Sequence, residues 1–240
     1  MEDSLRPELH RDDVVPNLWR AYKKTAEYKN GRTESISSIH PIVRKREAEG
    51  LNSIFIAFVS RLQSNVILKD RYISKNVGEW IADWKRMHNT LFHNVLKLRG
   101  DWRTTEVRFG APGDEDRHRI PKPIRVQSEM QEFAYMISKE LASTAEDDID
   151  AVCSYLAKVH YQFIRIHPFL DGNGRIARVL TDQLAVAMGL PPVVTGFPRT
   201  DDEKKRVYHE AITACISDPS CAQLMRWIKD QIERKIKQLA

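Results

Sequence analysis

The strongest constraint on the fold is a break between two helical patterns at residues 167–178, which read His-Pro-Phe-Leu-Asp-Gly-Asn-Gly-Arg-Ile-Ala-Arg. Upstream, apolar residues recur at spacings of three and four and predict an amphipathic helix. That helix should end at His167, because Pro168 lacks an N–H and disfavours helical angles at the residue before it. A second apolar stripe restarts at Ile176 and closes at Gly189. The sequence therefore predicts two helices joined by a tight loop.

The loop ends where the second helix begins, and such a helix end can bind an anion. Unpaired backbone N–H groups and the positive end of the helix dipole converge there. Gly172 and Gly174 permit a close approach to phosphate that a Cβ would block. Arg175 and Arg178 lie three residues apart on the first turn, so both guanidinium groups can reach the same anion. First-turn cations oppose the helix dipole, so a solvated surface alone does not explain their position.

Two further side chains in the segment add chemistry to the anion site. A histidine has an ordinary pKa of about 6.5, so His167 can accept a proton from an attacking hydroxyl near neutral pH. Asp171 offers hard oxygen ligands of the kind that Mg²⁺ takes together with substrate phosphates and water. Each residue alone has an ordinary structural explanation, but the combination supplies the elements of phosphoryl-type transfer.

The segment resembles the signature of Fic-domain proteins, His-Pro-Phe-x-Asp-Gly-Asn-Gly-Arg-x-x-Arg, at every specified position. The resemblance implies an all-α, Fic-like helical bundle with a small β-hairpin flap over the active site. It also implies transfer of AMP from ATP to a Ser, Thr or Tyr hydroxyl of a target protein, with release of pyrophosphate. In that scheme His167 is the catalytic base, Asp171 holds Mg²⁺, and Phe169 is grouped with the nucleotide-binding residues.

The same resemblance assigns the residues that surround the phosphates. The backbone at Gly172, Asn173 and Gly174 would form the anion hole. Arg175 and Arg178 would hold the phosphate chain, with Arg178 nearest the γ-phosphate. The cofactors implied are therefore ATP and Mg²⁺.

Segments before the motif extend the resemblance. Trp84–Leu98 predicts a helix, and Gly100–Arg103 resembles the family's Gly-x-x-Arg turn. Thr104–Phe109 and Ile120–Val126 flank a stretch rich in Gly, Pro and Asp and predict the two runs of the flap. An exposed edge at Ile120–Val126 could pair with an extended segment of a target protein. An ordinary surface hairpin is the alternative.

A segment after the motif supplies one more candidate for the nucleotide site. Arg206–Ala211 resembles the family helix that places an aromatic residue near the adenine, which makes Tyr208 a candidate adenine contact. The alternative is that Tyr208 packs in the core, as most tyrosines do.

Regulation is the point at which the sequence departs from the family pattern. Many Fic proteins carry an inhibitory helix, Ser/Thr-x-x-x-Glu-Gly/Asn, whose glutamate pairs with the second arginine. Glu49 and Gly50 match the end of that pattern, but Lys45 stands where Ser or Thr belongs. Pairing of Glu49 with Arg178 is therefore one hypothesis; a separate inhibitory protein, or no inhibition of this kind, is the alternative.

Composition sets the remaining limits. Residues 1–80 are expected to form an N-terminal helical extension, which could be regulatory, and residues 81–240 the Fic-like catalytic core. No apolar run approaches the roughly 18–20 residues of a membrane span, and the first 16 residues are too charged for a signal peptide. The net charge is +5, but charges of both signs are interspersed, which argues against nucleic acid as a partner. No membrane partner is expected either, and a homodimer is left open.

The three cysteines, Cys153, Cys215 and Cys221, show neither zinc nor redox spacing, and the first two fit a helix core. A reducing compartment is therefore expected, either the cytoplasm of the cell itself or that of a host. Two alternative functions stay open beside AMP transfer. One is a nucleotide-binding Fic-fold module without transferase activity, and the other is transfer of a different phosphate-containing group.

Overall fold

A computed structural model of the chain describes residues 41–62, 68–93, 95–96, 99–107, 119–192 and 202–239. In chain order, the helices are α4 (Pro41–Leu62), α5 (Leu68–Ile73), α6 (Val77–Leu91), the 3₁₀ helix η2 (Pro123–Arg125), α7 (Val126–Ser143), α8 (Ile149–Ile166), α9 (Asn173–Ala187), α10 (Asp202–Ala214) and α11 (Ala222–Leu239). The prediction of an all-α fold is confirmed, and the described residues contain no strand.

Helix α8 forms the centre of the bundle and contacts α7, α9 and α11. The Asp148 side chain caps its first turn by accepting hydrogen bonds from the backbone N–H groups of Asp150 and Ala151. Its last helical residue is Ile166, so the predicted helix end at His167 is confirmed. The next helix, α9, begins at Asn173, which confirms the predicted loop between two helices.

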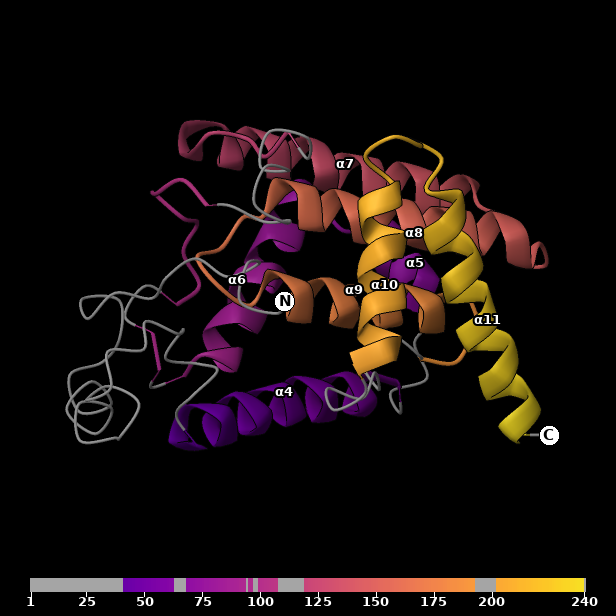
Figure 1. Cartoon of the computed structure of the whole chain (residues 1–240), viewed down its shortest axis with the longest axis horizontal. Coiled ribbons are helices and arrows are strands. Elements are labelled where there is room, and N and C mark those ends of the chain that lie inside the picture. The colour runs from indigo at the N-terminus through magenta and orange to yellow at the C-terminus, as the bar shows by residue number, and fades with distance from the viewer. Residues whose placement is uncertain are drawn as a thin grey trace.

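Helix α4 lies along one edge of the molecule, on the far side of α9 from α7 (Figure 1). It packs against α6, and Gly50 is the point of closest approach to the end of that helix. A Cβ at Gly50 would lie 2.6 Å from the carbonyl oxygen of Leu91, so only glycine allows this packing. The helix from the predicted extension is thereby held against the core, while the predicted boundary at residue 80 stays a prediction.

The β-hairpin flap is not confirmed. The described residues Thr104–Val107 form no strand, and Pro123–Arg125 forms a 3₁₀ turn that leads directly into α7 at Val126. The prediction of a strand at Ile120–Val126 is therefore wrong. The physical reason is that proline cannot donate to a strand ladder, whereas its fixed φ suits the first turn of a helix. Residues 108–118, which include the expected tip of the hairpin, lie outside the described residues.

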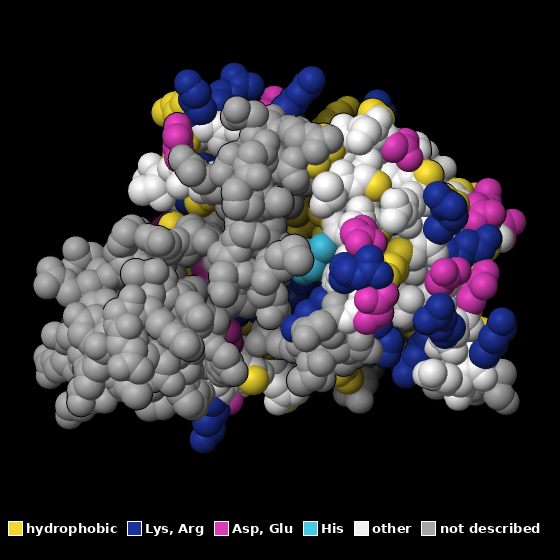
Figure 2. All heavy atoms as spheres, viewed as in Figure 1, with side chains coloured by type: hydrophobic (Ala, Val, Ile, Leu, Met, Phe, Trp, Pro, Cys, Tyr) yellow, Lys and Arg dark blue, Asp and Glu magenta, His cyan; other side chains and the backbone are white. Residues whose placement is uncertain are grey.

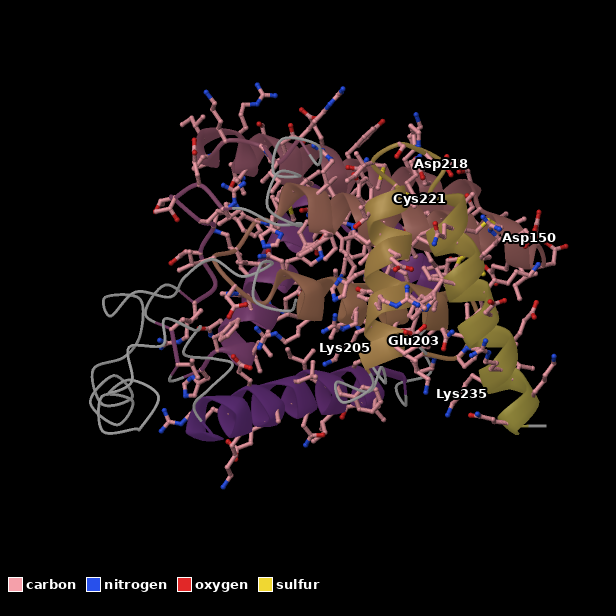
Figure 3. The ribbon with its side chains drawn as sticks, viewed as in Figure 1. Asp150, Glu203, Lys205, Asp218, Cys221 and Lys235 are labelled. Carbon is pink, nitrogen blue, oxygen red and sulfur yellow. A yellow bond between two sulfur atoms is a disulfide. The ribbon has the colours of Figure 1, made fainter. Side chains whose placement is uncertain are left out.

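Cys215 and Cys221 form a disulfide in the loop between α10 and α11, where Figure 3 labels Cys221. The turn brings their Cα atoms to 4.6 Å, which lies within the usual range for a disulfide. Cys153 is buried and unbridged. The spacing of the cysteines did not predict this pair. The disulfide gives no support to the expected reducing compartment.

The surface of the described region mixes charges of both signs, as Figure 2 shows for its right-hand part. Lys229 of α11, for example, lies 2.6 Å from Asp150 at the start of α8. None of the described helices combines the length and the apolar character needed to cross a lipid bilayer.

Candidate active site

His167 lies directly after the end of α8 in a left-handed conformation, with φ 50° and ψ 58°. Its side chain is buried, and Nδ1 lies 3.2 Å from the carbonyl oxygen of Ile164. A carbonyl can only accept, so Nδ1 carries the proton and Nε2 is the proton-accepting nitrogen. Left-handed angles cost a non-glycine residue about 1–3 kcal/mol, so the surrounding structure must hold this conformation.

Arg103 holds the backbone at His167. Its Nε donates to the His167 carbonyl over 2.7 Å, and its own backbone N–H donates to the Pro168 carbonyl over 2.9 Å. The other nitrogens of the guanidinium donate to the carbonyls of Pro121 at 2.6 Å and Thr105 at 3.1 Å. Burial lowers the pKa of Arg103 to about 10, which leaves it a cation at neutral pH. One side chain thus connects the candidate base to both ends of the 108–118 segment.

The motif loop is closed by Asn173. Its Oδ1 accepts from the Phe169 N–H over 2.9 Å, and its Nδ2 donates to the Phe169 carbonyl over 2.8 Å. Phe169 is completely buried and stacks on His88 with ring centroids 3.9 Å apart. Because the ring is buried below the loop, this geometry supports a packing role for Phe169 and not the predicted contact with the nucleotide.

Gly172 is the N-cap of α9 and has φ 80°, in the left-handed region. A Cβ there would lie 2.5 Å from Cε2 of Phe92, so both the backbone angle and the packing require glycine. The Gly172 N–H donates to Oδ1 of Asp171 over 2.6 Å, which orients that carboxylate at the start of the helix. The predicted turn at the helix N-terminus is therefore present.

Arg175 lies between two carboxylates. Its Nη2 is 3.0 Å from Asp171 Oδ1, and its Nη1 is 2.7 Å from Glu47 Oε2 of helix α4. All three side chains are buried. Burial alone would lower the pKa of Arg175, but the charges of Asp171 and Glu47 raise it above the ordinary value. The first arginine of the motif is thereby held by the N-terminal helix.

The predicted contact of Glu49 with Arg178 is not supported by this geometry. The Glu49 side chain is exposed and lies 4.0 Å from Lys45 on its own helix. Two residues along a helix differ in direction by roughly 200°, so Glu47 and Glu49 point to opposite sides. The spacing of three between Glu47 and Gly50, the point where α4 packs, was the signal that could have identified Glu47.

Burial raises the pKa of Tyr208 from helix α10, and the nearby charge of Arg178 acts against this rise. Tyr208 is 3% exposed, and its ring packs against Trp227 with centroids 5.0 Å apart. Its hydroxyl lies 2.7 Å from Nε2 of His160 on α8. A ring this buried has no face for an adenine, so the predicted adenine contact of Tyr208 is not supported.

His88 of α6 supports the loop from below. The backbone N–H of Gly100 donates to its Nδ1 over 2.8 Å, so its Nε2 carries the proton and donates to the Asp171 carbonyl over 3.1 Å. Burial lowers the pKa of His88 to about 4, which keeps it neutral at pH 7. Sequence reasoning missed His88 because it lies on the apolar face of a helix that was interpreted as core.

The structure thus brings together seven of the predicted residues in the loop and the first turns of α9: His167, Asp171, Gly172, Asn173, Gly174, Arg175 and Arg178. Two cavities in the described region lie instead between α4 and α6, beside Ser53 and Thr90. Neither is lined by residues of the motif.

This arrangement, a buried histidine beside the N-terminal end of a helix in an all-helical bundle, resembles that of a Fic domain. Residues 81–185 match the model of the Fic/DOC family. Among curated proteins, the protein adenylyltransferase Fic of Drosophila melanogaster is 29% identical over 157 residues, which cover 65% of this chain and 28% of that protein. The protein of the same name from Drosophila grimshawi is 27% identical over 157 residues, 65% of this chain and 29% of its own length. The chain spans less than a third of these relatives.

Solved structures agree on the fold. Fic-1 from C. elegans superposes with a TM-score of 0.60 at 21% identity, covering 89% of this chain and 56% of that one. A Fic-domain signalling protein from Bacteroides thetaiotaomicron gives a TM-score of 0.62 at 16% identity, covering 88% and 76%. At these identities the likeness establishes the fold alone.

Proposed function

We propose that this protein is a protein adenylyltransferase, which transfers AMP from ATP to a hydroxyl side chain of a target protein. The observation that carries the proposal is the position of His167, whose proton-accepting nitrogen belongs to the same buried loop as the anion-binding start of α9. The name of the Drosophila relatives, protein adenylyltransferase Fic, supports the same activity and ATP as its substrate.

The proposed step is a displacement at the α-phosphorus of ATP. The target oxygen forms a bond to that phosphorus, and the bond from it to the bridging oxygen of the β-phosphate breaks. The electron pair of this bond leaves with pyrophosphate, and the hydroxyl proton passes to Nε2 of His167. The carbonyl of Ile164 then accepts from Nδ1–H of the imidazolium and stabilises its charge.

Asp171 is the residue that would hold Mg²⁺ in this site. Its carboxylate supplies hard oxygen donors and is oriented by the Gly172 N–H and Arg175. The described residues hold no group of three or more His, Cys, Asp or Glu side chains suited to a metal. This fits an ion that takes one or two carboxylates and completes its shell with substrate phosphates and water. When bound, the ion would neutralise charge on the phosphates.

We place the target protein at residues 120–126, although they form no strand. Ile124 is 86% exposed, and the neighbouring Lys122 and Arg125 are exposed cations. An apolar side chain between two cations suits an acidic segment with an apolar residue. Arg103 connects Pro121 to the carbonyl of His167, so a target held here would lie near the base. The proposal includes no nucleic acid and no membrane partner, and it places the reaction in a cytoplasm, of the cell itself or of a host.

Helix α4 is the proposed element of regulation. Glu47 occupies Nη1 of Arg175, which ATP phosphates would need. The proposed inhibitory contact is therefore that of Glu47 with Arg175, in place of the expected contact of Glu49 with Arg178. A separate inhibitory protein acting on the same arginine, and a homodimer that moves α4, remain alternatives of this proposal.

Intact-mass measurement tests the function. After incubation with ATP and Mg²⁺, the protein or an added target should gain the mass of one AMP, and His167→Ala should abolish the gain. Parallel incubations with the other nucleoside triphosphates separate AMP transfer from transfer of another phosphate-containing group. ATP binding without any covalent product, also in Glu47→Gln, would instead identify a nucleotide-binding module.

A further inference from the structure

One residue, Arg103, holds the three successive carbonyls at the end of α8. Its Nε donates to the His167 carbonyl over 2.7 Å, its Nη2 donates to the Ile166 carbonyl over 3.4 Å, and its backbone N–H donates to the Pro168 carbonyl over 2.9 Å. The last carbonyls of a helix have no partner within the helix, and the Arg103 side chain, which is 4% exposed, supplies one. These contacts therefore hold the left-handed conformation at His167, with its φ of 50°.

The same guanidinium holds the stretch at which we place the target protein. Its Nη2 also donates to the carbonyl of Pro121, which lies three residues before the exposed Ile124. This bond is 2.6 Å long. Nε and Nη2 lie on one edge of a planar, rigid group, so the directions of their hydrogen bonds are fixed relative to each other. The Pro121 carbonyl therefore cannot move far from the His167 carbonyl without the loss of one of the two bonds.

A second arginine holds the start of the same stretch without reaching the base. Arg165 of α8 donates from Nη1 to the Arg119 carbonyl over 3.4 Å and from Nη2 to Glu129 Oε2 of α7 over 2.8 Å. Its Nε donates to a glutamine of its own helix. Among the described residues, none of these hydrogen bonds reaches His167. Arg165 thus fixes the stretch to the bundle, whereas Arg103 is the side chain that joins it to the base.

We propose that Arg103 is a positioning residue, through which a target protein bound at residues 120–126 fixes the position of the catalytic base His167. A bound target limits the motion of the Pro121 backbone, and the rigid guanidinium passes this restriction on to the His167 carbonyl. The base is thereby held most firmly when an acceptor hydroxyl is present. The inference rests on the proposed function, because it assigns a target to residues 120–126 and a base to His167.

Nuclear magnetic resonance on the unmodified chain tests the connection without any nucleotide. The probe is a synthetic peptide of aspartates and glutamates with one leucine and one tyrosine, which matches the acidic segment with an apolar residue proposed above. We expect it to shift the backbone signals of residues 120–126, the Nε–H signal of Arg103 and the backbone N–H signal of His167, all with one dissociation constant. Shifts at residues 120–126 without shifts at Arg103 and His167 would overturn the proposal. A peptide that shifts none of these signals would overturn the docking stretch and the proposal with it.

Arg103→Lys and Arg165→Met are matched variants, because each removes one guanidinium that holds this stretch. Arg103→Lys keeps a cation but loses the planar fork, so the peptide should still shift residues 120–126 but no longer His167. Arg165→Met should keep both shifts. A His167 shift that persists in Arg103→Lys, or that is lost equally in the two variants, would overturn the proposal. If Arg103→Lys does not fold, the titration of the unmodified chain decides alone.

AMP transfer to the same peptide gives a second readout. Ile124→Ala should lower kcat about threefold in the otherwise unchanged chain and should lower it no further in Arg103→Lys. Additive losses in kcat would overturn the proposal, because a purely structural contribution of Arg103 is independent of Ile124. If the peptide shifts the His167 signal but receives no AMP, the proposed function fails, while the titration still decides whether Arg103 connects residues 120–126 to His167.

Discussion

Replacement of Glu47 by glutamine should move stability and activity in opposite directions. The side chain is 2% exposed, and its Oε2 lies 2.7 Å from Nη1 of Arg175. Glutamine has nearly the same shape and keeps one acceptor oxygen, but it removes the negative charge. Arg175 retains its contact with Asp171 at 3.0 Å, so the guanidinium is not left as an isolated buried charge.

The size of the effect follows from that contact. Removing one charge from a buried ion pair costs about 3–5 kcal/mol, and Asp171 still pairs with Arg175, so we expect the free energy of unfolding to fall by about 2 kcal/mol. In a chain of this length this corresponds to a decrease in Tm of about 4–8 °C. If the phosphates of ATP must displace Glu47, loss of the same contact should strengthen ATP binding by up to about 30-fold, at tenfold for each ~1.4 kcal/mol.

The assay combines thermal unfolding, ATP titration and the rate of AMP transfer, each for Glu47→Gln and for Glu49→Gln. Glu49 lies on the same helix but is exposed, so its replacement should leave all three quantities nearly unchanged. Lower stability together with weaker ATP binding in Glu47→Gln would refute the reasoning. In that case Glu47 would serve to hold Arg175 in its productive position and not to keep the nucleotide out.

Three further predictions concern the supports of the loop. Arg103→Lys loses the forked contacts to the carbonyls of His167 and Pro121, so AMP transfer should fall at least tenfold at unchanged ATP affinity, as kinetics combined with titration would show. The folded-state pKa of His88 is about 4, below that of the unfolded chain. As the pH falls, the unfolded state therefore binds a proton at His88 before the folded state does, and the free energy of unfolding should fall by up to about 3 kcal/mol between about pH 6.5 and 4. Urea titrations at several pH values should show a weaker dependence on pH for His88→Gln. Reduction of the Cys215–Cys221 bridge should lower the free energy of unfolding by about 2 kcal/mol, a value set by the short loop that the bridge closes. The reducing agent should have no such effect on Cys215→Ser, which lacks the bridge.

Local sequence rules predicted the parts of this structure that local physics decides. Pro168 ends α8 at Ile166, and the turn at Gly172 opens α9 at Asn173. The all-α fold class came from the resemblance of the motif to Fic domains, and the apolar periodicity on both sides of the loop agrees with it. The prediction of a strand at Ile120–Val126 failed because prolines are compatible both with an edge strand and with the first turn of a helix, and here Pro123 begins the 3₁₀ turn Pro123–Arg125.

Contacts between segments distant in the sequence were not predictable in the same way. The choice between Glu47 and Glu49 depends on which face of α4 meets α6, and that face is set by the approach of Gly50 to the Leu91 carbonyl. The buried hydroxyl of Tyr208 contacts His160, which is 48 residues away in the chain. Neither pairing leaves a periodic signal in the sequence.

The motif residues are held in position by groups from distant parts of the chain. The carbonyls of His167 and Asp171 accept from Arg103 and His88, which lie 64 and 83 residues earlier in the chain. The first arginine of the motif pairs with Glu47 of α4, which lies 128 residues earlier in the chain. A graft of the twelve-residue segment alone should therefore keep its side chains but lose the left-handed angles at His167 and the direction of the Arg175 guanidinium.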